Sequence, residues 1–326
     1  MLGQPQQVKK TRVKRKKKKS RLRKLLKFFL LLFFIVLGYA AYVTYQAYDA
    51  SKSSYYSLER GDKSDLRDNA VTIADDPVSI LVLGVEDYAT KGKNGRTDSM
   101  ILVTLNPYSK SMKMLSIPRD TRVEIVGRNQ MDKINHAHAF GGTDMVIDTV
   151  ENFLKVPIDY FIKVNFNGFI HIIDEIGGIT VDVPFDFSED TTKKGEKVYF
   201  KKGEMHLNGE EALAYVRMRK QDPRGDFGRN ERQKQVLKAA VEKALTMSTL
   251  FKVDEISKHL GDNIQTNLRP LDILALRKKY SSLDSENIEN LSFQGQDHYE
   301  NGVYYFIPYE SSVDSVKIKL RVHLGL

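Results

Sequence analysis

Residues Val78–Val85 read VSILVLGV, a run of β-branched and aliphatic side chains that closes with a glycine and a valine. A short apolar run of this kind is typical of a buried strand. Two similar runs follow it, MILVTL at 100–105 and MKMLSI at 112–117. Asn106 and Pro107 lie between these two and favour a turn. The segment therefore predicts three consecutive strands of a buried sheet.

Helical patterns alternate with strand patterns along the rest of the chain. The clearest helix is predicted at Asn230–Leu250, where apolar residues repeat along one face and Lys and Glu lie opposite. Because strands and helices interleave without an internal repeat, we expect an α/β fold with α-β-α layers in one domain. Further strands are expected at 160–166, 179–183, 290–293 and 303–307, and further helices at 143–153, 166–176, 208–216, 270–280 and 311–322.

The N-terminal region has a different composition from the rest of the chain. Phe28–Tyr45 reads FFLLLFFIVLGYAAYVTY, which has no charged residue and approaches the length of about 20 residues that crosses a bilayer as a helix. A block of Lys and Arg precedes it directly and favours a cytoplasmic N-terminus. We therefore expect a basic cytoplasmic tail at 1–27, a transmembrane helix at 28–48, an extracytoplasmic stalk at 49–76 and an extracytoplasmic domain at 77–326.

The charge of the chain is concentrated in that tail. The formal net charge is +9, but thirteen of the 51 basic residues lie between Lys9 and Lys27. Without them the acidic residues are in slight excess, which argues against nucleic-acid binding by the folded part. A cleaved signal peptide and a nucleic-acid-binding arm are alternatives for the N-terminus, but the apolar run is long for the first. Its position directly after the basic block argues against the second. The absence of cysteine excludes disulfides and thiol chemistry.

Polar residues are concentrated where the predicted strands meet loops. Glu86 and Asp87 follow the first strand, a loop ending in GRTDS at 95–99 precedes the second, and Pro118-Arg119-Asp120 follows the third. Open α/β sheets bind ligands at such strand ends. Asp98 together with Glu86 or Asp87 has the oxygen ligands that Mg²⁺, or Mn²⁺, prefers.

A second polar stretch, YVRMRKQDPRGDFGRNERQ at 215–233, is rich in arginine. Arginine suits phosphate because its planar fork donates paired hydrogen bonds and stays charged. Arg217 and Arg219 would point the same way if extended, and Arg229 and Gln233 share a face at the start of the predicted helix, whose N-terminus favours an anion. The alternative is neutralisation by acidic residues of the same stretch, namely Asp222, Asp226 and Glu231.

Eight segments, taken in order, resemble the LytR-CpsA-Psr family of cell-envelope phosphotransferases. The resemblance runs from about Ile80 to Leu245. It implies a mixed central sheet flanked by helices, one N-terminal membrane anchor and an extracytoplasmic catalytic domain. The segments are ILVLGVED, GRTDSMILVTLNP, KMLSIPRDT, DKINHAHAFGG, VPIDYFIKVNFNGF, IDEIGGITVDVP, HLNGEEALAYVRMRK and DPRGDFGRNERQKQV.

The resemblance also implies an activity. Members transfer an anionic glycopolymer, such as wall teichoic acid or capsular polysaccharide, from a polyprenyl diphosphate carrier to a peptidoglycan hydroxyl. The expected product is a phosphodiester, the expected cofactor is Mg²⁺, and the expected location is the cell membrane of a Gram-positive bacterium. Two alternatives stay open, a pyrophosphatase that releases polyprenyl phosphate and a noncatalytic lipid-binding regulator of the envelope.

The resemblance assigns roles residue by residue. Asp98, Arg119 and Arg219 are expected to take part in catalysis. The metal is expected on Asp98 with Asp87 or Glu86; family members commonly have Asp where this chain has Glu86, so the second ligand stays open. The residues expected to bind the diphosphate are Arg96, Arg119, Arg217, Arg219, Arg229 and Gln233.

Overall fold

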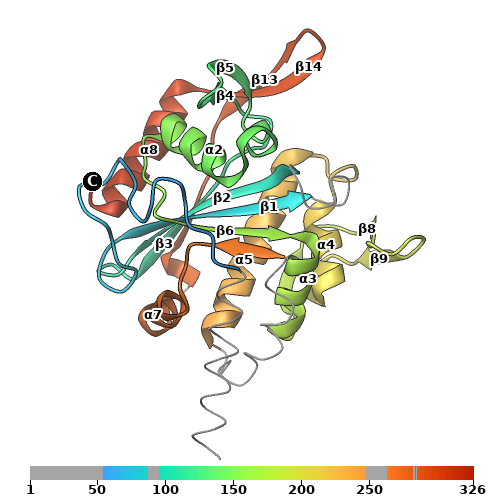
Figure 1. Ribbon diagram of the computed structural model, residues 1–326. Coiled ribbons are helices and arrows are strands. Elements are labelled where there is room, and N and C mark those ends of the chain that lie inside the picture. The colour runs from blue at the N-terminus through green and yellow to red at the C-terminus, as the bar shows by residue number, and fades with distance from the viewer. Residues whose placement is uncertain (1–53, 87–94, 247–262, 282, 284) are drawn as a thin grey trace, which may run out of the picture. The chain divides into compact units, whose positions relative to one another are not determined.

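A six-stranded sheet forms the centre of the computed structural model, which describes residues 54–86, 95–246, 263–281, 283 and 285–326 (Figure 1). The strand order is β11-β6-β1-β2-β3-β12. β1 pairs antiparallel with β2 and parallel with β6, so the prediction of a mixed sheet is confirmed. The strands are β1 (Val78–Glu86), β2 (Arg96–Asn106), β3 (Ser111–Ser116), β6 (Tyr160–Asn165), β11 (Ile264–Thr266) and β12 (Ile288–Leu291).

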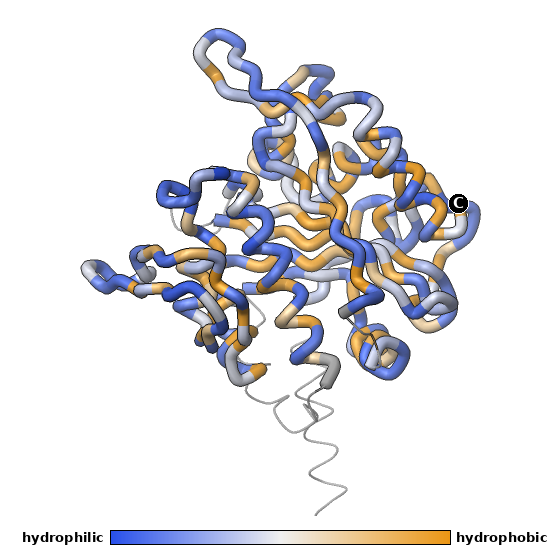
Figure 2. Tube along the Cα trace, turned by 180° about the vertical axis from the view of Figure 1, so that it is seen from behind, coloured by the Kyte–Doolittle hydropathy of each residue, from blue (hydrophilic) through white to orange (hydrophobic). Residues whose placement is uncertain are grey.

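Helices cover both faces of this sheet. On one face lie α2 (His136–Leu154) and α8 (Glu310–Leu324), and on the other lie α5 (Asp226–Thr246) and α7 (Pro270–Tyr280). The α-β-α layering is therefore confirmed, and Figure 2 shows the apolar strands enclosed between more polar outer elements. A short 3₁₀ turn, Ser285–Asn287, precedes β12.

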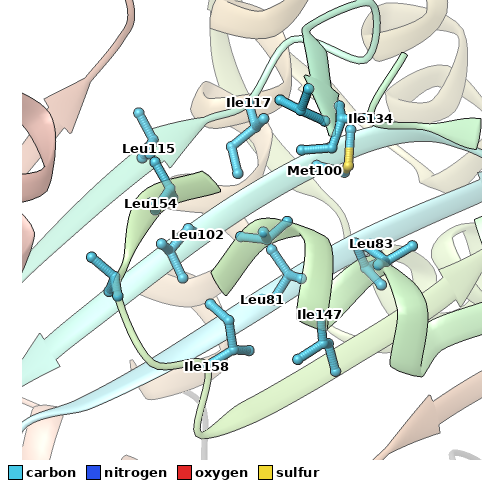
Figure 3. Close-up of a cluster of buried hydrophobic side chains, with 14 of the residues drawn as sticks. Leu81, Leu83, Met100, Leu102, Leu115, Ile117, Ile134, Ile147, Leu154 and Ile158 are labelled. Atoms are coloured by element: carbon cyan, nitrogen blue, oxygen red, sulfur yellow. The ribbon is translucent and has the colours of Figure 1, made fainter. Parts of the chain in front are cut away.

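The core under α2 is built from alternate residues of the central strands. Leu81, Leu102 and Leu115 are fully buried and pack with Ile147 of α2 (Figure 3). Ile80 of β1 points to the opposite face, into the cluster that α5 and α7 cover. Both faces of the sheet are thus buried, which explains why β1 reads as a continuous apolar run. Each fully buried leucine contributes about 1.5–3 kcal/mol of transfer free energy.

A second apolar cluster lies beside the sheet. Its helices are α3 (Phe166–Glu175) and α4 (Gly209–Arg217), and its centre is Tyr215, fully buried with Phe187 and Phe200. Asn208 caps α4 by accepting a hydrogen bond from the Glu211 amide, so the helix start is fixed locally. The strands of this region are β7 (Ile179–Val183), β8 (Phe187–Asp190), β9 (Lys197–Phe200) and β10 (Gly203–Leu207).

Two hairpins extend from the edge of the fold near α2. β4 (Arg122–Ile125) pairs with β5 (Gln130–Lys133), and β13 (Gly295–Glu300) pairs with β14 (Val303–Pro308) (Figure 1). The second hairpin is tied to the chain after β3, because the Phe306 amide donates to the Asp120 carbonyl at 2.9 Å. The sequence predicted β14 alone among these four strands.

Residues 54–76 are part of the folded domain. Arg67 forms a buried ion pair with Asp159 at 2.7 Å, Arg60 pairs with Glu151, and Ile73 is 1% exposed. The predicted stalk is therefore wrong for 54–76, because its charged residues have buried partners far along the chain. The remaining stalk residues, 49–53, lie outside the described residues.

The predicted tail at 1–27 and transmembrane helix at 28–48 also lie outside the described residues. Among the helices that the structure does describe, none is long and apolar enough to cross a membrane.

Candidate active site

Three strand ends meet at one edge of the sheet. β2 runs antiparallel between β1 and β3, so the ends of β1 and β3 lie beside the start of β2. The register passes from Gly84 opposite Ser99 to Val85 opposite Thr97, which leaves Asp98 in a β-bulge. Bulges re-aim a side chain and are frequent beside active sites.

The segment GRTDS is therefore largely strand, and its prediction as a loop is wrong. β2 starts at Arg96, and the polar side chains had concealed the strand. His138 supports this start, since its ring nitrogen Nδ1 lies 2.6 Å from the Gly95 carbonyl oxygen.

The bulge brings a carboxylate to an arginine. Asp98 Oδ1 accepts a hydrogen bond from Arg119 Nη1 at 2.6 Å. Burial raises the pKa of Glu86, and the neighbouring carboxyl of Asp98 raises it further, while Arg217 and Arg119 oppose the shift. Glu86 and Asp98 therefore lie close together as a carboxyl pair, an arrangement that a divalent cation stabilises.

Asp87, the alternative metal ligand, lies outside the described residues. Among the residues that are described, no group of three or more His, Asp or Glu side chains is arranged to hold a metal ion.

Asp226 joins three of the predicted arginines. Its Oδ1 lies 2.7 Å from Arg219 Nε and its Oδ2 lies 3.1 Å from Arg229 Nη2, with Arg119 Nε at 4.0 Å. One carboxylate thus faces three guanidinium groups, of which Arg119 is also paired with Asp98 and Asp120. The Nε groups of Arg119 and Arg229 have no hydrogen-bond partner within the described chain. This spare donor capacity is suited to an anion.

Arg229 is the most enclosed of the three arginines, with 7% of the residue exposed. Burial lowers the pKa of Arg229, and the carboxylate of Asp226 opposes that shift. A guanidinium in this setting is poorly hydrated, so its hydrogen bonds to an anion are stronger than they would be in water.

Helix α5 presents Arg229 and Gln233 on one face, as predicted. Gln233 Oε1 accepts a hydrogen bond from Ser99 Oγ at 3.0 Å, which brings the helix against β2. The helix begins at Asp226, earlier than predicted, and an acidic residue in the first turn complements the helix dipole. Gly228 in that turn admits the Asp222 carboxylate, because a Cβ would lie 1.8 Å from its oxygen.

The remaining predicted residues lie at the margin of the site. Arg217 is the last residue of α4, so the extended conformation that would align it with Arg219 does not occur. Its guanidinium lies over the Phe166 ring, 5.1 Å from the centroid, and close enough to Glu86 to oppose the rise in the pKa of that carboxyl. Arg96 is exposed at the start of β2 and forms no ion pair with another described residue.

Sequence reasoning missed two contributors. In the sequence Asp226 reads only as a neutralising neighbour of the arginines, and no motif singles out Lys133. Lys133 Nζ lies 2.7 Å from Asp120 Oδ1, which fixes the carboxylate next to Arg119. The sequence has a weak signal for Asp226, which lies between Arg219 and Arg229, since an acidic residue between two arginines can pair with both.

The LytR_cpsA_psr family model matches residues 41–322. The chain belongs to this family. It is 50% identical over 293 residues to polyisoprenyl-teichoic acid--peptidoglycan teichoic acid transferase TagV of Bacillus subtilis (strain 168), across 88% of this chain and 75% of that protein.

Solved structures of the family have the same fold. The crystal structure of B. subtilis TagV matches with a TM-score of 0.70 and 51% identity, and the match covers 77% of this chain and 98% of that one. The LytR-CPS2A-psr family protein YwtF (TagT) with bound octaprenyl pyrophosphate lipid matches with a TM-score of 0.67 and 34% identity, over 83% and 100% of the two chains.

Proposed function

We propose that this protein transfers an anionic glycopolymer from a polyprenyl diphosphate carrier to a hydroxyl of peptidoglycan, leaving a phosphodiester. The observation that carries the proposal is the convergence of Arg119, Arg219 and Arg229 on one carboxylate, Asp226. A diphosphate would accept hydrogen bonds from donors that the carboxylates leave without a partner among the described residues, namely Nε of Arg119 and Nε of Arg229. The teichoic acid transferase name of the 50%-identical relative and the octaprenyl pyrophosphate in a family structure support the same substrate class.

The arginines bind the diphosphate and stabilise charge during the reaction. Arg119, Arg219 and Arg229 have donors that can pair with phosphate oxygens, while Arg217 lies near the carboxyl pair on the other side of the site. Fixed, poorly hydrated cations stabilise developing charge more than water does, because they need no reorganisation as the reaction proceeds. Arg96 and Gln233 complete the proposed diphosphate-binding set.

The reaction is an in-line displacement at the sugar-proximal phosphorus. The acceptor hydroxyl oxygen forms the new bond to phosphorus, and the bond from phosphorus to the bridging oxygen breaks. The bridging oxygen leaves with the electron pair as polyprenyl monophosphate. The hydroxyl proton passes to a carboxylate, for which Asp98 and Asp120, both beside Arg119, are the candidates.

Glu86 and Asp98 would hold Mg²⁺, or Mn²⁺, at this site. Their proximity, and the raised pKa of Glu86 that burial and Asp98 cause, fit a pair that gains from a cation. Asp87 is the alternative partner of Asp98. When bound, the cation supplies positive charge to the diphosphate oxygens.

The protein is proposed to act at the outer face of the cell membrane. The apolar segment 28–48 is its anchor, and the basic tail at 1–27 stays in the cytoplasm. This topology delivers the domain to the compartment where peptidoglycan is assembled.

The test is a reconstituted transfer with the full-length chain in detergent. The reaction contains a synthetic polyprenyl diphosphate oligosaccharide, peptidoglycan oligomers and Mg²⁺, and mass spectrometry follows glycan-phosphate on the acceptor sugar. Arg119→Ala is compared with Arg321→Ala, a control on α8 whose guanidinium, among the described residues, donates to the backbone carbonyl of Lys155.

Wild type and the control should form the joined product, and Arg119→Ala should not. Release of glycan-phosphate without joining would make the protein a hydrolase. Full activity of Arg119→Ala would contradict the proposed site.

A further inference from the structure

The β13–β14 hairpin presents aromatic rings on one face. Tyr299 and Tyr304 are cross-strand partners whose ring centroids lie 5.5 Å apart in an edge-to-face arrangement. Phe306 follows two residues along β14 and therefore shares that face. Asp297, opposite Phe306, accepts a hydrogen bond from the Tyr304 hydroxyl at 2.8 Å, which fixes the ring.

This aromatic face leads to the arginine cluster. The Phe306 ring contacts Phe227, with centroids 5.8 Å apart, and Phe227 directly follows Asp226. Burial and the Asp297 hydrogen bond raise the pKa of Tyr304, and the charges of Asp120 and Asp226 raise it further. Tyr304 thus lies within electrostatic reach of the carboxylates at the proposed reaction centre.

The rings are open to a ligand at both ends of the face. Tyr299 is 69% exposed at the hairpin and Phe227 is 48% exposed beside the arginines. We define the aromatic strip as Phe227, Tyr304 and Tyr299. Phe306 joins Phe227 to Tyr304 but is only 2% exposed, so the strip has two accessible ends linked by a buried ring. Phe306 and Tyr304 are successive residues on one face of β14 and lie about 7 Å apart, so the strip extends outward from the site over more than one ring width.

The chemistry of the strip favours a sugar chain. The face of an aromatic ring is electronegative and attracts the weakly positive C–H groups on one side of a pyranose ring. Tyrosine hydroxyls and the Asp297 carboxylate add hydrogen-bonding groups that an acyl chain cannot use. In peptidoglycan the stem peptide is joined through an amide to the lactyl carboxyl of muramic acid, so the sugar backbone is uncharged. Asp297 therefore does not repel it, whereas it repels the anionic glycopolymer being transferred.

We infer that the aromatic strip binds the glycan chain of the peptidoglycan acceptor and directs its attacking hydroxyl toward the arginine cluster. This inference rests on the proposed function, because it assigns the second substrate of the same reaction. The strip would stack acceptor sugars while the diphosphate occupies the arginines.

Binding of the acceptor alone is the first test. The probe is a tetrasaccharide of alternating N-acetylglucosamine and N-acetylmuramic acid with its lactyl carboxyls amidated, titrated calorimetrically into the full-length chain without donor. Tyr299→Ala and Tyr304→Ala should each weaken binding about fivefold, as expected for loss of one stacked ring. Tyr199→Ala is the matched control, since Tyr199 is 70% exposed on the separate β8–β9 hairpin.

Transfer kinetics provide the second readout. Tyr299→Ala should raise KM for the acceptor about fivefold and leave KM for the polyprenyl diphosphate donor unchanged. Unchanged tetrasaccharide affinity in both strip variants, or a rise in donor KM instead, would overturn the inference.

The two proposals fail separately. A wild-type chain that binds the tetrasaccharide through the strip but forms no joined product would sustain this inference and refute the transferase function. If both tyrosine variants transfer glycopolymer at the wild-type rate and bind the acceptor with unchanged affinity, the inference about the strip is refuted and the transferase function is sustained.

Discussion

Two buried arginines, three positions apart on helix α5, have different surroundings. Arg232 is 2% exposed, pairs with the fully buried carboxylate of Asp222 and donates to the carbonyls of Tyr215 and Met218. Arg229 is also largely buried, but it shares the carboxylate of Asp226 with Arg219 and Arg119. Every nitrogen of the Arg232 guanidinium donates a hydrogen bond to the protein, whereas Nε of Arg229 has no partner among the described residues.

The difference separates a structural arginine from a binding arginine. Arg232 joins α5 to the end of α4, so its hydrogen bonds hold the fold together. Arg229 keeps an unpartnered Nε within the described structure and shares the Asp226 carboxylate with two other arginines. Arginines of the same stretch therefore have different functions, which their residue type does not distinguish.

The largest expected effect is on stability, from Arg232→Ala. Removing one partner leaves the Asp222 carboxylate buried and unpaired, which should reduce the free energy of unfolding by about 3–5 kcal/mol. Chemical denaturation of the purified chain measures it. Arg224→Ala is the control, because it removes an exposed guanidinium that pairs with Glu231 and lies 3.8 Å from the same Asp222 carboxylate, and such exposed pairs contribute less than about 1 kcal/mol each. Equal losses in the two variants would refute the structural role of Arg232.

Arg229→Gln should instead reduce activity. Loss of one charge-stabilising donor lowers transfer about 100- to 1000-fold in comparable sites. Stability should change little, because Asp226 keeps Arg219 as its partner. Transfer rate and thermal midpoint are measured on the same preparation. If Arg229→Gln lost as much stability as Arg232→Ala, the role of Arg229 would be structural and not ligand binding.

Asp226→Asn tests whether a ligand can replace the shared carboxylate. The change leaves buried arginine charge without a counter-charge and should cost about 1–3 kcal/mol of stability. Added octaprenyl diphosphate should raise the thermal midpoint of this variant more than that of wild type, because it supplies the missing negative charge. Asp186→Asn, at an exposed site, is the control. Equal shifts would mean that the diphosphate does not approach Asp226.

The smallest effect is expected from Glu86→Gln. Because the folded-state pKa of Glu86 is raised by burial and then by Asp98, its contribution to stability is full below its ordinary pKa and is lost as pH rises through the raised pKa. At neutral pH the thermal midpoint of the variant should therefore be higher than that of wild type. The difference should not exceed about 3 °C, because the group is partly exposed and its charge is screened. At acid pH the two proteins should have the same thermal midpoint.

The same variant sharpens the metal proposal. Mg²⁺ should raise the thermal midpoint of wild type at neutral pH, since binding to the native state alone is stabilising, and should have less effect on Glu86→Gln. An identical Mg²⁺ response in the two proteins would exclude Glu86 as a ligand and favour Asp87.

Much of the fold could be predicted from local patterns. The apolar runs of β1 and β7 and the helix face of α4 had nearly correct boundaries, because burial on both faces or on one face leaves a periodic trace in the sequence. Polar strands left no such trace. The predicted second strand began at Met100, whereas β2 begins at the polar residue Arg96, and the exposed strand β13 was not predicted.

The sequence by itself determined the layered α/β class and the chemistry of the site, because hydrophobic periodicity and the anion-binding character of arginine are properties of short segments. Only the tertiary structure decided which arginines share Asp226, because Ser99 and Gln233, which join β2 to α5, are 134 positions apart. It also decided that 54–76 is folded and that the aromatic strip leads to the arginines. These outcomes depend on long-range packing, in which residues acquire partners that no local pattern specifies.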